Sequence, residues 1–344
     1  MLKKVVIGLL SGFVVMTLVV VFGWFLLNWS VDKPVLLFTT QDFTIEEGDS
    51  LNYIGKRLED LGVIDSFEVF SIMGQLLGVA TSLQRGDYQI TPGISVREVL
   101  VMFTQGQVRY YDVTLVEGLR FVDIIQQLNS HPKLTEPLSE QDLQSLFTQL
   151  GINGSPEGLF YPDTYFFESG EQVRSVLVRA HKRLNQVLEE EWRNKSRKLP
   201  YETPYEALVL ASIIEKETGA TFERPDISGV FVRRLQLNMR LQSDPTVIYG
   251  MGDMYQGGLN RKNLREKTSY NTYVINGLPP SPIALVGREA INAALHPSEG
   301  KTLYFVAKGD GTHYFSESLA EHNKAVRKYQ VKGRRVDYRS SVVN

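Results

Sequence analysis

The stretch that decides the fold of the second half of the chain is TPYEALVLASIIEKETG, Thr203–Gly219. Thr203 is a typical N-cap, Pro204 suits the first helical position, and Glu206 completes a capping box. Gly219 is typical of a helix end, so the segment predicts an apolar helix with carboxylates in its last turn. Burying a charge costs free energy, and such a carboxylate is therefore either paired or used as an acid.

Helical geometry assigns two of these carboxylates to different faces. At about 100° per residue, Glu215 shares a sector with Ser212 and other small residues, which leaves room for a substrate. Glu217 falls on the other side of the helix, among large apolar residues. We therefore select Glu215 as the candidate catalytic residue. The alternative is an ion pair between Glu215 and an arginine such as Arg233 or Arg234.

Further motifs flank this helix. An upstream block reads EGLFYPDTYFF (Glu157–Phe167). The downstream motifs are, in order, SDPTVIYGMG (Ser243–Gly252), SYNTYVINGLPPSPI (Ser269–Ile283), HP (His296–Pro297), LYFVAKGDGTHYF (Leu303–Phe315) and HN (His322–Asn323). Together with EKET (Glu215–Thr218) at the end of the helix, these motifs resemble the YceG-like (MltG) family of membrane-bound endolytic murein transglycosylases of bacteria. The resemblance covers nearly the whole chain, with one departure: Ser281 stands where a glycine is expected after the paired prolines.

The resemblance implies an enzyme that acts inside peptidoglycan glycan strands. It would cleave the β-1,4 bond between N-acetylmuramic acid (MurNAc) and N-acetylglucosamine (GlcNAc), form 1,6-anhydro-MurNAc ends and so terminate nascent strands. It assigns catalysis to Glu215, the first Glu of EKET. Because the C6 hydroxyl of the sugar attacks C1 in this chemistry, one Glu serves first as acid and then as base. The implied partners are glycan strands and penicillin-binding synthases, and no cofactor is implied.

Polar and aromatic residues in and near these motifs are candidates for a sugar groove. Aromatic faces pack on sugar rings, and hydroxyl, amide and carboxyl groups bond sugar hydroxyls and N-acetyl groups. The candidate substrate-binding residues are Ser212, Gln242, Asp244, Tyr249, Tyr270, Asn271, Thr272, Tyr273, Tyr161 and Asp163. Packing or turn formation is the alternative role for each of them.

Two other functions stay open. A hydrolytic muramidase needs a second carboxylate, for which Glu217, Asp244 and Asp163 are candidates. A non-catalytic cell-wall-binding scaffold would carry a degenerate site. The intact EKET motif argues against the scaffold, and the lack of a second carboxylate on the face of Glu215 argues against the hydrolase.

The N-terminus predicts a membrane anchor. Val5–Leu27 contains 23 residues and no charge. As a helix it would be about 34 Å long at 1.5 Å per residue, enough to cross a hydrocarbon core of about 30 Å. Lys3 and Lys4 favour a cytoplasmic N-terminus, which would make this a single-pass protein of the inner (cytoplasmic) membrane with its catalytic part in the periplasm. A cleaved signal peptide is the alternative, but no Ala-x-Ala pattern follows.

Composition excludes several classes of function. A chain of 344 residues with 43 % hydrophobic residues is long enough for two or three domains and is not disordered. The formal net charge of −2 argues against a nucleic-acid binder. The chain has no cysteine, and its five histidines show no H-E-x-x-H spacing, so we expect neither a metal site nor a cofactor.

A sequence pattern is repeated three times in the part of the chain that follows the N-terminal helix. It consists of FTIEEGDSLNYIGKRL (Phe43–Leu58), the shorter YQITPGISVREVL (Tyr88–Leu100) and VTLVEGLRFVDIIQQL (Val113–Leu128). Each predicts a strand, a turn glycine and an amphipathic helix. We expect an α+β protein with a cytoplasmic tip and transmembrane helix at 1–28, a linker at 29–41, a small LysM-like module at 42–106, a mixed α+β YceG-like catalytic domain at 107–335 and a tail at 336–344. Glycan binding and simple spacing are both open for the module.

Apolar spacing and turn residues predict the elements of the catalytic part. We expect helices at Phe121–Leu128, Glu140–Leu150, Gln172–Trp192 and Phe231–Leu235, an irregular loop at Asp244–Pro282, a hairpin of Leu303–Val306 with His313–Phe315, and a final helix capped by Ser318.

Overall fold

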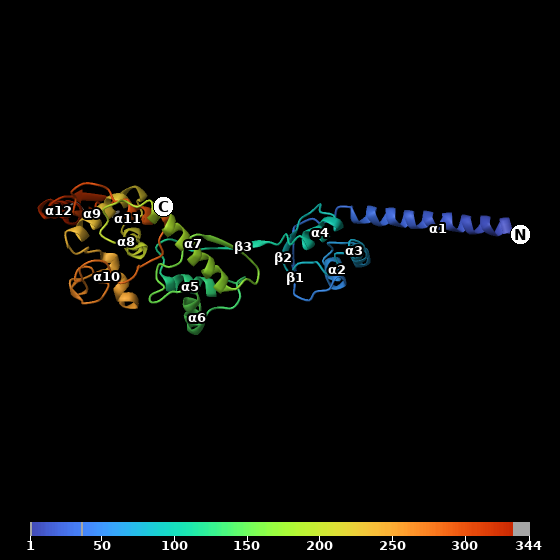
Figure 1. Cartoon of the computed structure of the whole chain (residues 1–344), viewed down its shortest axis with the longest axis horizontal. Helices are drawn as coiled ribbons and strands as arrows, with labels where there is room; N and C mark the ends of the chain where they lie inside the picture. The colour runs from blue at the N-terminus through green and yellow to red at the C-terminus, as the bar shows by residue number, and fades with distance from the viewer. Residues whose placement is uncertain (1, 36, 333–344) are drawn as a thin grey trace. The chain divides into compact units, whose positions relative to one another are not determined.

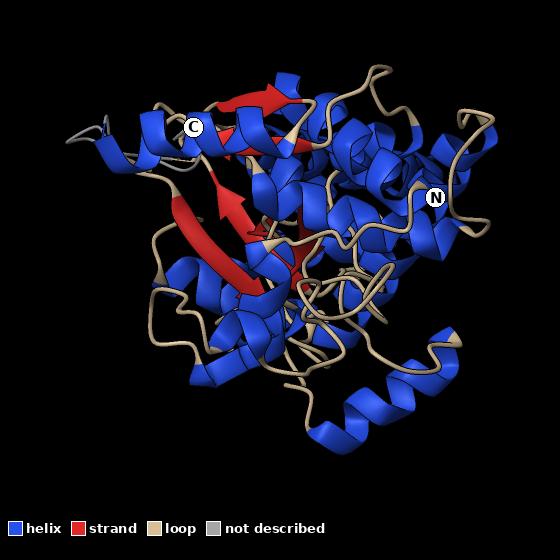
Figure 2. Ribbon diagram, turned by 90° about the vertical axis from the view of Figure 1, so that its left-hand side faces the viewer, coloured by secondary structure: helices blue, strands red, loops and turns tan. Residues whose placement is uncertain are grey.

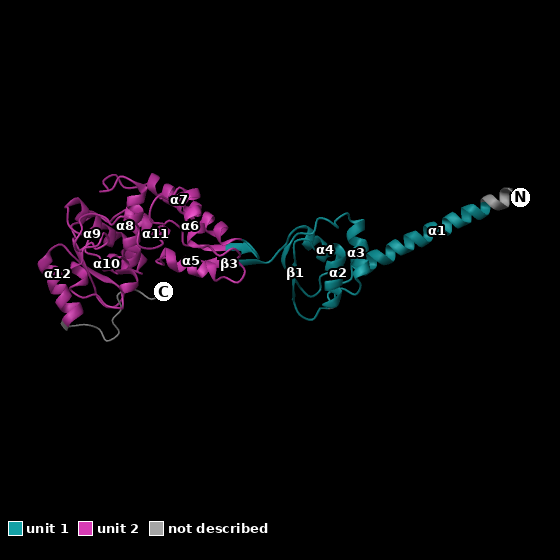
Figure 3. Cartoon of the chain, turned by 90° about the horizontal axis from the view of Figure 1, so that it is seen from below, with its two compact units in different colours: residues 1–111, 166–171 teal, residues 112–165, 172–344 magenta. Residues whose placement is uncertain are grey.

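The computed structural model describes residues 2–35 and 37–332. Its contacts divide the chain into two compact units, 1–111 with 166–171 and 112–165 with 172–344 (Figure 3). Both units mix helices with short strands, and helices account for most of the regular structure (Figure 2). The expected α+β class is thus confirmed. The predicted tail at 336–344 lies outside the described residues.

Helix α1, Leu2–Val31, begins the first unit (Figure 1). Its segment Ile7–Val31 has a mean hydropathy of 2.4 in its most apolar window, and none of that window is buried. A core helix of a soluble protein would be covered by its neighbours, whereas large apolar side chains such as Phe13 and Val19 are exposed here. The helix is long and apolar enough to cross a membrane, and it indicates a single-pass anchor.

The end of α1 belongs to the core of the first unit. Val31 is fully buried in that core, and Arg97 donates hydrogen bonds to Asp32 at 2.6 Å and to Asn28 at 2.8 Å. The segment 29–41 was expected to be a linker. Its first residues instead belong to α1, which continues through Val31 and is packed there.

The rest of the first unit consists of β1 (Gln41–Ile45), α2 (Leu51–Asp60), α3 (Phe67–Leu76), β2 (Gly86–Ile90) and α4 (Val96–Thr104). The strands pair antiparallel with Phe43 opposite Tyr88, and both side chains are buried. Gly48 and Gly93 make the turns at φ values of 92° and 89°, a conformation that favours glycine. The first two predicted strand–turn–helix units are confirmed. Helix α3 has no counterpart among the expected elements.

The remaining helices and strands belong to the second unit, except that β3 and β4 each have residues in both units. They are β3 (Tyr110–Thr114), α5 (Phe121–Asn129), α6 (Glu140–Leu150), β4 (Thr164–Glu168), α7 (Val173–Arg193), α8 (Pro204–Glu217), η1 (Thr221–Glu223), α9 (Arg224–Gln236), α10 (Asp244–Met251), η2 (Gly252–Met254), η3 (Asn263–Arg265), α11 (Arg288–Leu295), β5 (Tyr304–Ala307), β6 (His313–Ser316), α12 (Leu319–Val326) and η4 (Arg327–Lys332). Strand β3 pairs with β4, and β5 pairs antiparallel with β6.

Helix α8 lies at the centre of the second unit. Its N-terminus has the predicted capping box: the backbone N–H of Glu206 donates to Thr203 Oγ1 at 3.2 Å, and the backbone N–H of Thr203 donates to Glu206 Oε2 at 3.0 Å. The helix packs against α7, α9, α10 and α11, and its residues 207–214 are all buried. A helix covered on all sides positions its C-terminal carboxylates rigidly.

The predicted helical stretch Phe231–Leu235 is confirmed as part of the longer α9. The segment Asp244–Pro282 differs from the expected irregular loop, because it begins with α10. Helix α11 was also not expected. Helices α10 and α11 have eight residues each, too few for a clear apolar period. The predicted hairpin and the final helix capped by Ser318 are confirmed.

Candidate functional site

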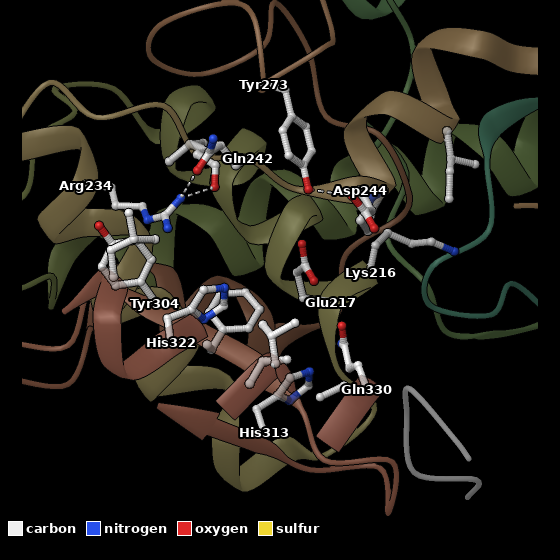
Figure 4. A pocket seen from close by; sticks show the side chains of 18 residues that line it. Lys216, Glu217, Arg234, Gln242, Asp244, Tyr273, Tyr304, His313, His322 and Gln330 are labelled. Carbon is white, nitrogen blue, oxygen red and sulfur yellow. Dashed lines mark hydrogen bonds between the residues drawn. The ribbon is translucent and has the colours of Figure 1, made fainter. Parts of the chain in front are cut away.

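A pocket of about 620 Å³ lies in the second unit, among the end of α8, the start of α10, the β5–β6 hairpin and α12 (Figure 4). Its volume falls within the range of small-molecule sites, about 300–1,000 Å³. The charged, aromatic and amide side chains that line it are Lys216, Glu217, Arg234, Gln242, Asp244, Tyr273, Tyr304, Phe305, His313, His322 and Gln330. All of them except Phe305 are labelled in Figure 4.

Glu217 is the carboxylate of α8 that lines this pocket. Ser243 Oγ donates a hydrogen bond of 2.5 Å to Glu217 Oε1. Burial raises the pKa of Glu217 to about 7, and the neighbouring charge of Asp244 adds to the rise, while Ser243 and Arg234 oppose it. At neutral pH a substantial fraction of the carboxyl groups therefore carries a proton that can be donated.

The expectation that Glu217 points away from the open side of α8 is wrong. Helical geometry places it correctly on a different face from Glu215, but the open space lies on the face of Glu217. The start of α10 and the β5–β6 hairpin form the pocket there. These elements come from distant parts of the sequence, so the period of one helix cannot reveal which face they leave open.

Glu215 lies in a closed ion-pair network outside the residues that line the pocket. Arg224 Nη2 donates to Glu215 Oε1 at 2.6 Å, and the backbone N–H of Gly287 donates to Oε2 at 3.1 Å. The Glu215 side chain is 5 % exposed. Burial raises its pKa to about 7 against the opposing charge of Arg224. Arg224 also pairs with Glu289 at 3.1 Å, so this network joins α8, α9 and α11.

The room predicted beside Glu215 is filled by packing. Ser212 is fully buried, donates to the carbonyl of Val209 and accepts a hydrogen bond from the backbone N–H of Ile283 at 3.0 Å. The alternative of an ion pair for Glu215 is confirmed, but its partner is Arg224 rather than Arg233 or Arg234.

Three of the predicted substrate-binding residues meet Glu217 in the pocket. Tyr273 donates a hydrogen bond of 2.6 Å to Asp244 Oδ1, and Gln242 Oε1 accepts one of 3.2 Å from Arg234 (Figure 4). Burial and the carboxylate of Asp244 raise the pKa of Tyr273, so its hydroxyl remains a donor at neutral pH. Donors and acceptors of this kind suit a ligand that is rich in hydroxyl groups.

The structure gives Tyr249 and Tyr270 packing contacts. Their rings meet at an edge, with centroids 4.8 Å apart. The Tyr249 hydroxyl donates to Glu157 at 3.2 Å, and the Tyr270 hydroxyl shares a hydrogen bond of 2.8 Å with Ser281 Oγ. Ser281, the residue that departs from the family pattern, thus contacts Tyr270 through its side chain.

Four further candidates lie outside the pocket lining. Asn271 donates to the carbonyls of its own loop, and Thr272 Oγ1 accepts a hydrogen bond of 2.9 Å from the backbone N–H of Ser243. Thr272 therefore holds the residue that contacts Glu217. Tyr161 is buried in the core, and Asp163 accepts from the backbone N–H of Thr164 at a turn. The turn and packing alternatives hold for Tyr161 and Asp163.

Several residues that line the pocket were not predicted from the sequence, and one of them, His313, is paired with Glu223 behind it. His313 Nδ1 lies 2.8 Å from Glu223 Oε2, and the backbone N–H of His313 donates to Glu223 Oε1 at 2.9 Å. The histidine of THYF directly after the GDG turn and the glutamate of TFER, which follows EKET after two residues, were the available signals. Within residues 2–35 and 37–332, no group of three or more His, Asp or Glu side chains is arranged to hold a metal ion.

The known proteins to which this chain is similar are YceG-like proteins and endolytic murein transglycosylases. The model of the YceG-like family matches residues 43–328. An endolytic murein transglycosylase of Bacillus subtilis is 30 % identical over 89 % of this chain and 90 % of its own length. One from Streptococcus pneumoniae is 25 % identical over 82 % of this chain, which spans 57 % of that relative. A crystal structure of a putative YceG-like protein from Listeria monocytogenes, 28 % identical, covers 83 % of the chain with a TM-score of 0.52. The chain belongs to the YceG-like family.

Proposed function

We propose that this protein is an endolytic murein transglycosylase, a lyase that cleaves peptidoglycan glycan strands internally. The similarity to relatives with this name over most of the chain supports the reaction class. The observation that carries the proposal is Glu217, a carboxylic acid with a pKa of about 7 in a pocket lined by hydrogen-bonding side chains. A carboxyl group with a raised pKa can protonate the poor leaving oxygen of a glycosidic bond.

The proposed substrate bond is the β-1,4 linkage from MurNAc to GlcNAc. Glu217 protonates the bridging oxygen, and the C6 hydroxyl of MurNAc attacks C1. The product is a 1,6-anhydro-MurNAc end, and no water is consumed. A base in the pocket must accept the proton of the attacking hydroxyl.

The catalytic role expected for Glu215 passes to Glu217 in this proposal. Both carboxyl groups have a pKa near 7, but Glu215 is closed in by Arg224 and Gly287, whereas Glu217 lines the pocket. We assign Glu215 a structural role, which is to hold the end of α8 against α9 and α11. Among the other predicted residues, Gln242, Asp244 and Tyr273 are proposed to bind the glycan.

A hydrolytic muramidase remains the second candidate because of Asp244. On the helix face of Glu215, the sequence places no second carboxylate. In the structure Asp244 lines the same pocket as Glu217 and is close enough to raise its pKa. Most glycoside hydrolases use two carboxyl groups that flank the bond to be cleaved.

The products distinguish the two reactions. Uncrosslinked glycan digested in heavy-oxygen water would be analysed by mass spectrometry before and after borohydride reduction. We expect internal fragments whose new MurNAc ends resist reduction and carry no label. Reducible, labelled ends would contradict transglycosylation and favour Asp244 as a hydrolytic partner.

The proposed location follows from α1 and the two lysines near its N-terminus. With Lys3 and Lys4 on the cytoplasmic side, the second unit lies outside the cytoplasm, where peptidoglycan is found. We propose penicillin-binding synthases as partners, and a LysM-like glycan-binding or spacing role for 42–106. Alkaline phosphatase is active only outside the cytoplasm, so a C-terminal fusion to it should be active. A fusion that is expressed but inactive would contradict this orientation.

A further inference from the structure

His313 lines the pocket and forms with Glu223 a carboxylate–imidazole pair that has no role in the mechanism described above. Glu223 ends the short helix η1, and His313 begins β6, 90 residues later. The His313 side chain is 5 % exposed and the Glu223 side chain 7 % exposed. Both oxygens of Glu223 accept hydrogen bonds from His313, one from its backbone N–H and one at Nδ1. A buried carboxylate bonded in this way holds the imidazole in one orientation.

The same contacts define which ring nitrogen is available. A carboxylate accepts hydrogen bonds, so the Nδ1 of His313 carries the proton shared with Glu223. In the neutral ring Nε2 is then unprotonated. His313 lines the pocket that contains Glu217, and its ring packs edge-on against Phe305 with centroids 5.4 Å apart. Among the described residues, the His313 ring is hydrogen-bonded to Glu223 through Nδ1, which leaves Nε2 for a molecule in the pocket.

We propose that the His313–Glu223 pair is the general base of the reaction, while Glu217 is the acid. This inference rests on the proposed transglycosylase function. The proton of Glu217 passes to the glycosidic oxygen as the bond from that oxygen to C1 breaks. The C6 oxygen forms the new bond to C1, and its proton passes to His313 Nε2. The imidazolium is stabilised by the Glu223 carboxylate, and the proton returns to Glu217 through solvent after the product leaves.

A separate base has a physical advantage in this pocket. Glu217 starts the reaction protonated, so it can accept a proton only after it has donated its own. Its deprotonated form is also disfavoured by burial and by the charge of Asp244. His313 can accept a proton while Glu217 donates, and a buried carboxylate stands behind it to balance the charge.

His313→Asn tests the inference most directly. The asparagine amide can still donate to Glu223 from a position close to that of Nδ1, but it has no group in place of Nε2. We expect kcat of the full chain on uncrosslinked glycan to fall about 10²–10⁴-fold, the usual contribution of a general base. The KM and the melting temperature should change little. Because ring closure is slowed, water should compete for C1, and the share of reducing ends should rise.

His313→Gln provides a second variant without a base, and His296→Asn is the matched control because His296 lies outside the pocket lining. Wild-type kcat in either His313 variant would overturn the inference, as would a loss of activity that follows the melting temperature with an unchanged ratio of product ends. Failure of the wild-type enzyme to form anhydro ends would overturn the proposed function instead. The two failures are therefore distinguishable.

Discussion

The two carboxylates at the end of α8 are two residues apart and have nearly the same pKa, yet their surroundings differ. Burial raises both values to about 7. Glu215 lies against Arg224 and a backbone N–H in a network that joins three helices. Glu217 bonds a serine hydroxyl and lines a pocket of about 620 Å³. A raised pKa therefore does not identify a catalytic acid on its own, because access to the substrate must accompany it.

Replacing each carboxylate by its amide should separate the two roles most strongly. We expect Glu217→Gln to lower kcat on glycan by about 10²–10⁴-fold or more, because it removes the proton donor at nearly constant volume. Glu215→Gln should retain much more activity per folded molecule. Turnover measured beside circular dichroism checks both variants. If the effects were reversed, the catalytic role would return to Glu215.

The network around Glu215 should matter most for stability. Arg224→Ala leaves a buried Glu215 without its ion-pair partner, a change that typically costs about 3–5 kcal/mol. We expect a lower free energy of unfolding in urea, with m unchanged. The double variant Arg224→Ala with Glu215→Ala should recover part of the loss, because no unpaired charge is then buried. A double variant no more stable than Arg224→Ala would argue against a paired, structural Glu215.

The pH dependence of stability should reveal the cost of the Glu217 charge. Its pKa is raised from 4.5 to about 7 on folding, so the folded state binds the proton more tightly than the unfolded state. Below pH 4.5 both states are protonated and the charge costs nothing. Between pH 4.5 and 7 the wild type loses stability relative to Glu217→Gln, by about 3 kcal/mol in total at 1.36 kcal/mol per pKa unit. Thermal unfolding of both proteins at pH 4 and pH 8 measures this difference. An equal difference at both pH values would contradict it.

The smallest effect is expected for two tyrosines, Tyr273 in the pocket of Glu217 and Tyr270 in the packed region outside it. Tyr273→Phe removes a donor to Asp244 in the pocket, and we expect kcat/KM to fall about tenfold, equivalent to 1.4 kcal/mol for a hydrogen bond to a charged group. Tyr270→Phe removes a contact with Ser281 in the packed region, and it should change melting temperature rather than kcat/KM. Equal losses of kcat/KM in both variants would mean that Tyr270 also contacts the glycan.

Local signals in the sequence predicted much of the fold. The capping box of α8, the turn glycines Gly48 and Gly93 and the hairpin of β5 with β6 are short-range features, and the structure has all of them. The short helices α10 and α11 were missed because two turns carry too little periodicity. Of the predicted site residues, Gln242, Asp244 and Tyr273 line the pocket together with Glu217, and their role in binding the glycan stays a prediction.

The sequence by itself determined the apolar N-terminal helix, the caps and ends of α8 and the membership in the YceG-like family, because each depends on neighbouring residues or on motifs in order. Only the tertiary structure decided which carboxylate of EKET lines a pocket and which is sealed by Arg224. It also brought Glu223 to His313 across 90 residues. Such pairings depend on how whole helices and hairpins pack, and the period of a single helix contains no information about the elements that will cover it.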